Sequence, residues 1–299
     1  MPVSISVVIP AFNSMKYLRE TLDSVLNQTI LPNEVLVIDD GSTDNTAAFA
    51  ESYGLPVRVF RRTNQRQAAS RNFGIQAATC EWIALLDHDD VWEPNKLERQ
   101  MEELARHPEA DLCYTGRVLL IQKGDTTILG RVIDVPPAED IKRALYEGVT
   151  FLPSAVLIRR SAILAIGGFD PKICHGSDDY DMWLRLLHAG AKFAACREPL
   201  VQYRRHEGNW SLDTAWFDEY MEIYRRLVLP YLPKSSAGIA FNRFRSAHEC
   251  DLAFALRERG NPTCLSMMAR SILHSPFVDP LRYKVLAHML FSRVIGRNN

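Results

Sequence analysis

Short apolar runs alternate with amphipathic segments over the first two-thirds of the chain. Between the runs, apolar residues recur at helical spacing, as Leu18, Leu22 and Val25 do. Strand–helix alternation of this kind predicts an α/β fold with a mostly parallel central sheet and flanking helices. Four runs rich in β-branched or bulky apolar residues are predicted to be buried strands: residues 5–9, 34–38, 57–60 and 82–86.

Polar residues mark where the predicted helices begin. We expect Asn13 or Ser14 to cap the first helix, and Ser42 or Thr43 to cap a second helix that ends near Tyr53. Further helices are predicted over residues 67–77, after Pro94, and over 161–166 and 179–188. Later strands are predicted at residues 111–115, 118–122, 127–135, 155–159 and 200–204, with a hairpin turn at Gly124-Asp125.

The pattern changes after about residue 210, where only helical segments follow. We therefore predict a catalytic domain over residues 1–210 and a helical C-terminal extension over 211–299. The last twenty residues are basic and amphipathic, which favours either peripheral contact with an anionic membrane through residues 280–299 or a terminal helix docked on the protein. The helices expected in the extension span residues 216–229, 237–257, 262–273 and 281–295.

Composition narrows the class of protein. The 299 residues carry a net charge of −1, so the chain lacks the basic character of a nucleic-acid-binding protein. Its six cysteines are scattered, which is typical of buried thiols in a reducing compartment. The sequence shows neither a signal-peptide pattern nor an apolar run of about 18 residues, and we expect a cytoplasmic location.

Carboxylates crowd the end of the fourth predicted strand. Asp87, Asp89 and Asp90 follow it within four residues. Like charges at that spacing repel, and a hard cation such as Mg²⁺ would relieve the repulsion. The alternative is a solvated acidic turn that precedes the next helix. The position favours a site, because ligands of open α/β sheets bind outside the carboxyl ends of the strands.

Other polar groups follow strand ends in the same way. Pro10, Ala11 and Asn13 lie at the end of the first strand, and Asp39-Asp40 at the end of the second. Because parallel strands share one carboxyl edge, these groups should converge on the crevice that holds Asp87.

Six motifs in this order resemble the family 2 glycosyltransferases, which are inverting enzymes with the GT-A nucleotide-diphospho-sugar transferase fold. The resemblance covers about residues 3–211. The motifs are Val-Val-Ile-Pro-Ala-Phe-Asn (7–13), Val-Ile-Asp-Asp-Gly-Ser-Thr-Asp (37–44), Ala-Ser-Arg-Asn-Phe-Gly (69–74), Leu-Asp-His-Asp-Asp (86–90), Gly-Gly-Phe-Asp (167–170) and Asp-Asp-Tyr-Asp-Met-Trp-Leu-Arg (178–185).

The resemblance implies a nucleotide pocket. Pro10, Ala11 and Asn13 would line it, and Asp39 would bind the nucleoside with Asp40 beside it. For Asp40, a helix N-terminal acid is the alternative. Arg71 would lie near the nucleotide, or would form an ion pair with the acids of the Asp87 loop.

The resemblance also implies a metal site that uses Mg²⁺ or Mn²⁺. Asp89 would ligate the metal, while Asp87 would orient the donor or share the metal. His206 would bind either the metal or a phosphate, with a purely structural histidine as the alternative. Arg204 and Arg205, which directly precede it, have guanidinium groups that suit phosphate recognition.

Asp179 matches the general base, which takes the proton of the acceptor hydroxyl. Trp183 and Arg185 in the same motif are expected to be structural. One departure from the family is Asn64-Gln65-Arg66, which places arginine where a glycine is usual. A second is Ser177-Asp178-Asp179, where the family usually has Glu-Asp before the aromatic residue.

The expected reaction is sugar transfer from a nucleotide-diphosphate sugar, for which we expect a UDP-sugar, to a hydroxyl of a bacterial surface glycan or lipid-linked intermediate. Nucleotidyl transfer is an alternative, although the turn at residues 10–13 lacks the Gly-rich basic loop it uses. An Asp-x-Asp phosphatase would carry that motif after its first strand, and a non-catalytic binding protein of the same fold would lack Asp179. A homo-oligomer is compatible with the sequence.

Overall fold

The chain divides into two compact units in the computed structural model, which describes residues 4–123, 126–206, 214–258 and 261–275 with residues 283 and 286. The first unit contains the sheet. The second holds the described helices from Thr214 onwards, together with Tyr146–Gly148 and His175–Tyr180. The boundary expected at residue 210 lies outside the described residues, so the two-domain division stays a prediction.

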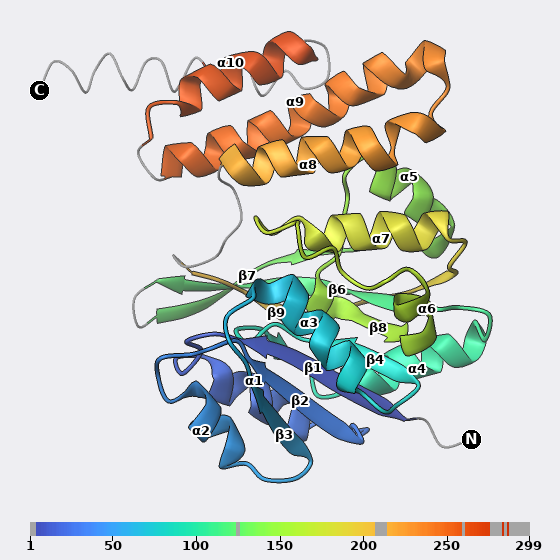
Figure 1. Cartoon of the computed structure of the whole chain (residues 1–299). Helices are drawn as coiled ribbons and strands as arrows, with labels where there is room; N and C mark the ends of the chain where they lie inside the picture. The colour runs from blue at the N-terminus through green and yellow to red at the C-terminus, as the bar shows by residue number, and fades with distance from the viewer. Residues whose placement is uncertain are drawn as a thin grey trace, which may run out of the picture. The chain divides into compact units, whose positions relative to one another are not determined.

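A mixed sheet forms the centre of the first unit (Figure 1). Its strands are β1 (Ile5–Ala11), β2 (Glu34–Asp39), β3 (Val57–Arg61), β4 (Trp82–Leu85), β5 (Val91–Trp92), β6 (Leu112–Lys123), β7 (Thr126–Ile133), β8 (Val156–Arg159) and β9 (Phe193–Arg205). Their order is β3-β2-β1-β4-β8-β6-β9-β5, and β7 pairs with β6. Strands β1 to β4 are mutually parallel, and β8 then joins antiparallel to β4.

Helices cover both faces of the parallel part, which confirms the α/β fold. Val7 and Ile9 of β1 share a core with Leu18 and Leu22, whereas Val8 faces the opposite helix layer at Gly74. The helices of this part are α1 (Leu18–Leu26), α2 (Thr46–Glu51), α3 (Arg66–Ala77), α4 (Lys96–Arg106), α5 (Ile141–Tyr146), α6 (Arg160–Ala165) and α7 (Asp178–His188).

Gly74 allows α3 to lie close against the sheet. A Cβ at this position would come within 2.4 Å of Val8 Cγ1 and 3.2 Å of Ile38 Cγ1. We expect Gly74→Ala to lower the free energy of unfolding by about 1–3 kcal/mol, because the added methyl overpacks a rigid core. Urea denaturation would measure the loss. An unchanged midpoint would show that α3 can move away from β1 without cost.

Four elements differ from the sequence expectation. The two strands predicted at 111–115 and 118–122 are one strand, β6, whose register shifts near Gly116 against β9 and after Val118 against β7. These irregularities interrupt the alternation that would reveal a single strand. Strand β9 begins at Phe193, earlier than predicted, and the short α5 and β5 were not predicted. The β6–β7 hairpin is confirmed, while its turn lies outside the described residues.

The predicted helix caps were wrong. Helix α1 begins only at Leu18 and α2 only at Thr46, and neither has a side-chain cap. The Asn13 side chain instead accepts the Thr43 N–H in the loop after β2 at 2.8 Å, and the Ser14 N–H donates to Thr46 Oγ1 at the start of α2 at 2.7 Å. The polar side chains join two loops rather than starting helices.

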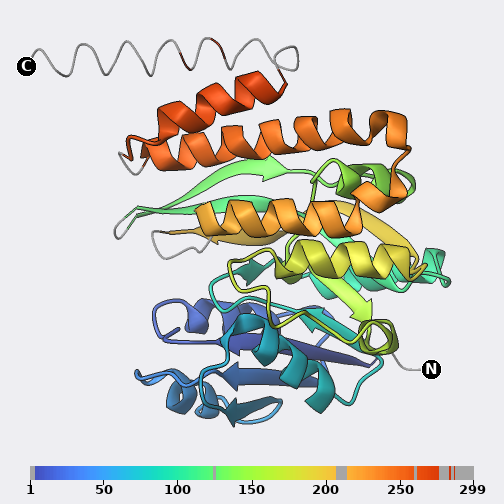
Figure 2. The same ribbon diagram turned by 45° about the horizontal axis from the view of Figure 1, so that its top comes forward.

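The second unit contains α8 (Thr214–Leu227), α9 (Lys234–Glu258) and α10 (Cys264–His274). Figure 2 shows α9 and α10 side by side. Aromatic rings join α8 to α9, and the Tyr224 and Phe244 rings are tilted with their centroids 3.9 Å apart. Between α9 and α10, Ser246 and Ser271 each donate to the other's carbonyl oxygen at 2.7 Å. Three predicted helices are thereby confirmed; the one at 281–295 lies outside the described residues apart from 283 and 286.

Across the residues described, no helix combines the length and apolar character needed to cross a membrane.

Candidate active site

The loops after β1 and β2 are bonded to each other at the carboxyl edge of the sheet. The side-chain oxygen of Asn13 accepts the Thr43 N–H at 2.8 Å, and Ser42 Oγ accepts the Asn13 N–H at 2.9 Å. Asn13 has a φ of 49°, a left-handed conformation that asparagine adopts more readily than most residues. The predicted convergence of these two strand ends is present, with Pro10 and Ala11 buried as the last residues of β1.

Asp39 and Asp40 are both 4% exposed and have separate partners. Asp39 Oδ1 accepts the Ser42 N–H at 3.3 Å. Asp40 accepts the Gln65 N–H at 2.9 Å, and its own N–H donates to the Ala11 carbonyl at 2.8 Å. Asp40 therefore fixes the loop after β3 at the residue that precedes α3, and its role at the nucleotide stays a prediction.

Arg66 has a left-handed backbone conformation, which glycine adopts more readily than arginine. Its φ is 70°, in the left-handed region that costs a residue with a Cβ roughly 1–2 kcal/mol. The flanking contacts hold it there, because Gln65 bonds to Asp40 and the Gln67 side chain donates to Asp87 at 3.0 Å. The loop thus links the Asp39-Asp40 turn to the Asp87 loop.

Asp87 forms a buried ion pair with α3. Arg71 Nη2 lies 2.6 Å from Asp87 Oδ1, and the Arg71 side chain is only 3% exposed. The Asp87 N–H donates to Ser154 Oγ at 3.0 Å. The ion pair with the Asp87 loop, one of the two roles considered for Arg71, is therefore present, and it brings Arg71 to the same edge.

Asp89 meets His206, which is more than one hundred positions later in the sequence. Asp89 Oδ2 lies 2.9 Å from His206 Nε2, and the Asp89 side chain is 12% exposed. Burial alone would raise the pKa of Asp89, but the hydrogen bond from His206 and the nearby His88 and His206 charges outweigh it, so the pKa lies below its usual value. Asp89 is therefore an ionised carboxylate at neutral pH.

Asp90 is fully buried and is bonded to two other parts of the first unit. Its carboxylate accepts Ser154 Oγ–H at 2.5 Å and the Arg204 N–H at 3.0 Å. Burial, reinforced by the charges of Asp89 and Asp87, raises the pKa of Asp90 well above its usual value. Asp90 holds β9 and the segment before β8 in place rather than meeting a ligand. No motif in the sequence indicated Ser154 as its partner.

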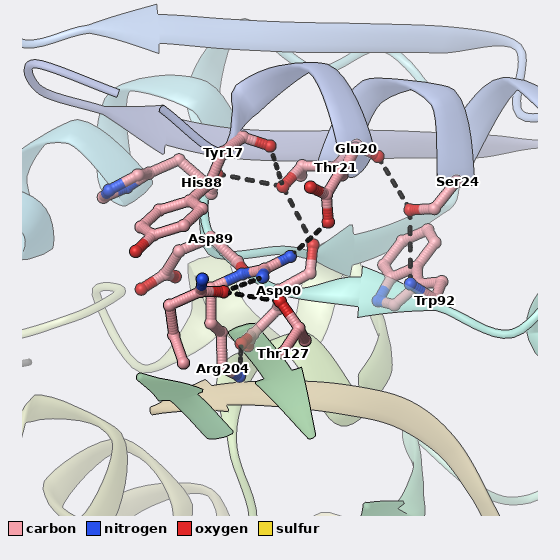
Figure 3. A network of polar contacts seen from close by, with 11 residues as sticks. Tyr17, Glu20, Thr21, Ser24, His88, Asp89, Asp90, Trp92, Thr127 and Arg204 are labelled. Atoms are coloured by element: carbon pink, nitrogen blue, oxygen red, sulfur yellow. Dashed lines mark hydrogen bonds and ion pairs between the residues drawn. The ribbon is translucent and has the colours of Figure 1, made fainter. Parts of the chain in front are cut away.

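The guanidinium of Arg204 lies inside the protein, in the network of Figure 3. Arg204 is 1% exposed, and its Nε donates to the Asp89 carbonyl at 2.8 Å. Its Nη2 lies 2.5 Å from Glu20 Oε2, and its Nη1 donates to Gln122 at 3.3 Å. The expectation that Arg204 binds phosphate was therefore wrong, because the fold uses this side chain to support the loop that carries Asp89.

The Asp89–His206 pair fits a divalent metal. Two adjacent ligands of an octahedral ion at about 2.1 Å lie about 3 Å apart, close to the 2.9 Å between Asp89 Oδ2 and His206 Nε2. Mg²⁺ and Mn²⁺ accept oxygen ligands, and imidazole suits several divalent metals. Asp87 is a weaker ligand candidate, because its Oδ1 accepts hydrogen bonds from both Arg71 and Gln67.

The family model of Glycosyl transferase family 2 matches residues 6–166, which include the Asn13, Asp39-Asp40, Arg71 and Asp87–Asp90 positions. The chain belongs to this family. It is therefore a glycosyltransferase that transfers a sugar from a nucleotide sugar, which decides against the nucleotidyltransferase, phosphatase and binding-protein alternatives.

Relatives of this glycosyltransferase support the same assignment. A glycosyltransferase of uncharacterised activity from Rickettsia typhi is 30% identical over 266 residues, which cover 86% of this chain and 80% of the relative. TuaG of Bacillus subtilis, named for teichuronic acid biosynthesis, is 29% identical over 67% of this chain and 78% of its own. Among solved structures, S. aureus TarS 1–349 in complex with UDP-GlcNAc superimposes with a TM-score of 0.64 at 19% identity, covering 91% of this chain and 81% of TarS 1–349, which supports the fold.

The late motif of the glycosyltransferase opens α7. The Tyr180 N–H donates to Asp179 Oδ1 at 2.6 Å, within the second unit. In the first unit, Arg185 pairs with the buried Asp181 at 2.5 Å, and Trp183 Nε1 donates to the Phe151 carbonyl at 2.9 Å. Trp183 and Arg185 are structural, as predicted. The role of Asp179 as the base stays a prediction.

Proposed function

We propose that this protein is an inverting, metal-assisted glycosyltransferase that moves one sugar from a UDP-sugar to an acceptor hydroxyl. The pairing of Asp89 with His206, next to the Arg71–Asp87 ion pair, is the observation that carries the proposal. It brings an ionised carboxylate and an imidazole nitrogen to the edge of the sheet where the nucleotide is expected.

The chain's own groups would bind the donor along this edge. The turn of Pro10, Ala11 and Asn13 would line the base, and Asp39 would accept hydrogen bonds from the nucleoside. Asp40 would support the pocket through Gln65 rather than touch the donor, since its carboxylate already accepts the Gln65 N–H.

Asp89 and His206 would hold Mg²⁺ or Mn²⁺. When bound, such an ion neutralises charge on the departing nucleoside diphosphate. Asp87 would orient the donor, because Arg71 and Gln67 fix its carboxylate from α3. Arg71 is committed to Asp87, so its positive charge serves the site through that contact.

Asp179 would act as the general base. The acceptor oxygen forms a bond to the anomeric carbon, and its proton passes to the Asp179 carboxylate. The bond from the anomeric carbon to the diphosphate breaks on the opposite side, so the sugar leaves with inverted configuration and the nucleoside diphosphate takes the electron pair.

The acceptor is proposed to be a bacterial surface glycan or a lipid-linked intermediate, in a cytoplasmic enzyme. A relative named for teichuronic acid biosynthesis supports a polysaccharide setting. Peripheral membrane contact through residues 280–299 would bring the enzyme to a lipid-linked acceptor.

A donor panel tests the proposal. Full-length protein is incubated with Mn²⁺ and UDP-, GDP- or dTDP-sugars, with and without lipid-linked acceptors, and release of nucleoside diphosphate is recorded. We expect release with a UDP-sugar and stimulation of that release by an acceptor. Absence of release and of binding for every donor would contradict the proposal.

Replacing Asp89 by asparagine should weaken metal-dependent donor binding. Changes to groups that merely support metal ligands cost about 10- to 100-fold in affinity, so loss of a direct ligand should cost at least about 100-fold. Calorimetry of UDP binding across a Mn²⁺ titration measures the effect. Asp134→Asn is the matched control, because Asp134 makes an exposed ion pair with Arg197. Equal Mn²⁺ dependence in wild type and Asp89→Asn would exclude ligation by Asp89.

A further inference from the structure

Tyr17 lies beside Asp89 and His206, the two candidate metal ligands, although none of the family motifs includes it. It directly precedes α1 and is 8% exposed. Its ring centroid is 5.0 Å from that of His206, and the Arg204 guanidinium carbon lies 4.6 Å from the Tyr17 ring centroid. The ring is therefore held between two residues that both contact Asp89.

The hydroxyl of Tyr17 is buried without a hydrogen-bond partner among the residues that the structure describes. Leaving a buried donor unpaired costs about 1–3 kcal/mol, so native proteins rarely keep one. Other tyrosines do have partners, since Tyr53 donates to Asp23 at 2.8 Å and Tyr114 to the Pro136 carbonyl at 2.7 Å. The orphan hydroxyl lies at the site and not in an unrelated part of the core.

The surroundings indicate what the hydroxyl would bind. Figure 3 shows the Tyr17 hydroxyl and the Asp89 carboxylate on the same side of the network. Arg204 brings positive charge against the face of the Tyr17 ring. A phenol next to a guanidinium and to two candidate metal ligands is well placed to donate a hydrogen bond to an anionic oxygen. Hydrogen bonds to charged acceptors are about twice as strong as those between neutral groups.

We propose that the Tyr17 hydroxyl donates a hydrogen bond to a diphosphate oxygen of the nucleotide donor. Tyr17 is thus a donor-binding residue that works next to Asp89 and His206. The inference rests on the proposed function, because it requires a nucleoside diphosphate at this edge. The hydroxyl acts in donor binding and orientation and takes no part in proton transfer.

Tyr17→Phe tests the proposal by removing one atom. Hydrogen bonds to charged groups are worth about 1.5–3 kcal/mol, which corresponds to about a 10- to 100-fold weaker UDP affinity. Calorimetry with Mn²⁺ should record this loss for UDP, whereas uridine, which has no phosphate, should bind equally to both proteins. The melting temperature without nucleotide should be unchanged or higher, since the variant removes an unpaired buried group.

Tyr53→Phe is the matched control, because its hydroxyl already has a partner in Asp23. It should lower the melting temperature and leave UDP affinity unchanged, the opposite of Tyr17→Phe. If Tyr17→Phe bound UDP with wild-type affinity, this inference would be overturned and the proposed function would stand. The hydroxyl would then bond to a water or to the sugar instead of the diphosphate. Failure of wild-type protein to bind any nucleoside diphosphate with Mn²⁺ would instead overturn the proposed function.

Discussion

Asp179→Asn is expected to lower the rate of sugar transfer by a factor of about 10²–10⁴ while donor binding persists. General-base catalysis contributes that range, and asparagine cannot accept the acceptor proton. The fold should tolerate the change, because the Asp179 oxygen that accepts the Tyr180 N–H is retained in asparagine. Nucleoside diphosphate release and calorimetric UDP affinity, measured on the same preparation, separate the two effects.

A neighbouring carboxylate provides the control for Asp179. Asp181 is fully buried and pairs with Arg185, so Asp181→Asn should lower the melting temperature through loss of that ion pair. Asp179→Asn should leave the melting temperature unchanged. If Asp179→Asn kept wild-type turnover with saturating acceptor, another group would have to take the proton.

Arg204→Met is expected to lower the free energy of unfolding by about 2–3 kcal/mol. The substitution removes hydrogen bonds from a buried cation to the Asp89 carbonyl and to Glu20. The larger cost of stranding a buried charge does not apply, because the Glu20 side chain is 59% exposed and would be solvated again. Methionine keeps much of the side-chain volume, so the loss reports the polar contacts more than a cavity. Urea denaturation measures the effect.

Arg204→Lys separates charge from geometry. Lysine keeps the positive charge, but its single ammonium group cannot bond several acceptors as the planar guanidinium does. The stability of Arg204→Lys should therefore lie between those of wild type and Arg204→Met. UDP affinity should fall in the same order, since Arg204 supports the Asp89 backbone and packs on Tyr17. If Arg204→Met kept wild-type stability, the hydrogen bonds of the guanidinium would not contribute to stability, because water could take their place.

Local pattern was sufficient for β1, β2 and β4, whose continuous apolar runs are buried on both faces of the sheet. The strand ends that place Asp39-Asp40 and Asp87 at one edge follow from apolar runs, because parallel strands align their carboxyl ends. The pattern was insufficient for β6, since the register shifts near Gly116 break the alternation.

Side-chain roles were harder to predict than elements. Arg204 was expected to bind phosphate because arginine usually does, but the fold buries it against the Asp89 loop. Asn13 was expected to cap α1, and it instead bonds to Thr43. In each case the residue has the expected chemistry, and a partner far along the chain decided its use.

The sequence alone determined the family, the α/β architecture and the candidates Asp39, Asp87, Asp89 and Asp179, because these depend on local motifs and on strand ends. Only the tertiary structure decided that His206 meets Asp89 and that Asp90 is buried against Ser154. It also decided that the Tyr17 hydroxyl beside them has no hydrogen-bond partner in the part of the chain that the structure describes. The physical reason is that burial and hydrogen-bond partners across a sheet depend on which distant strands pair, and no local pattern encodes that pairing.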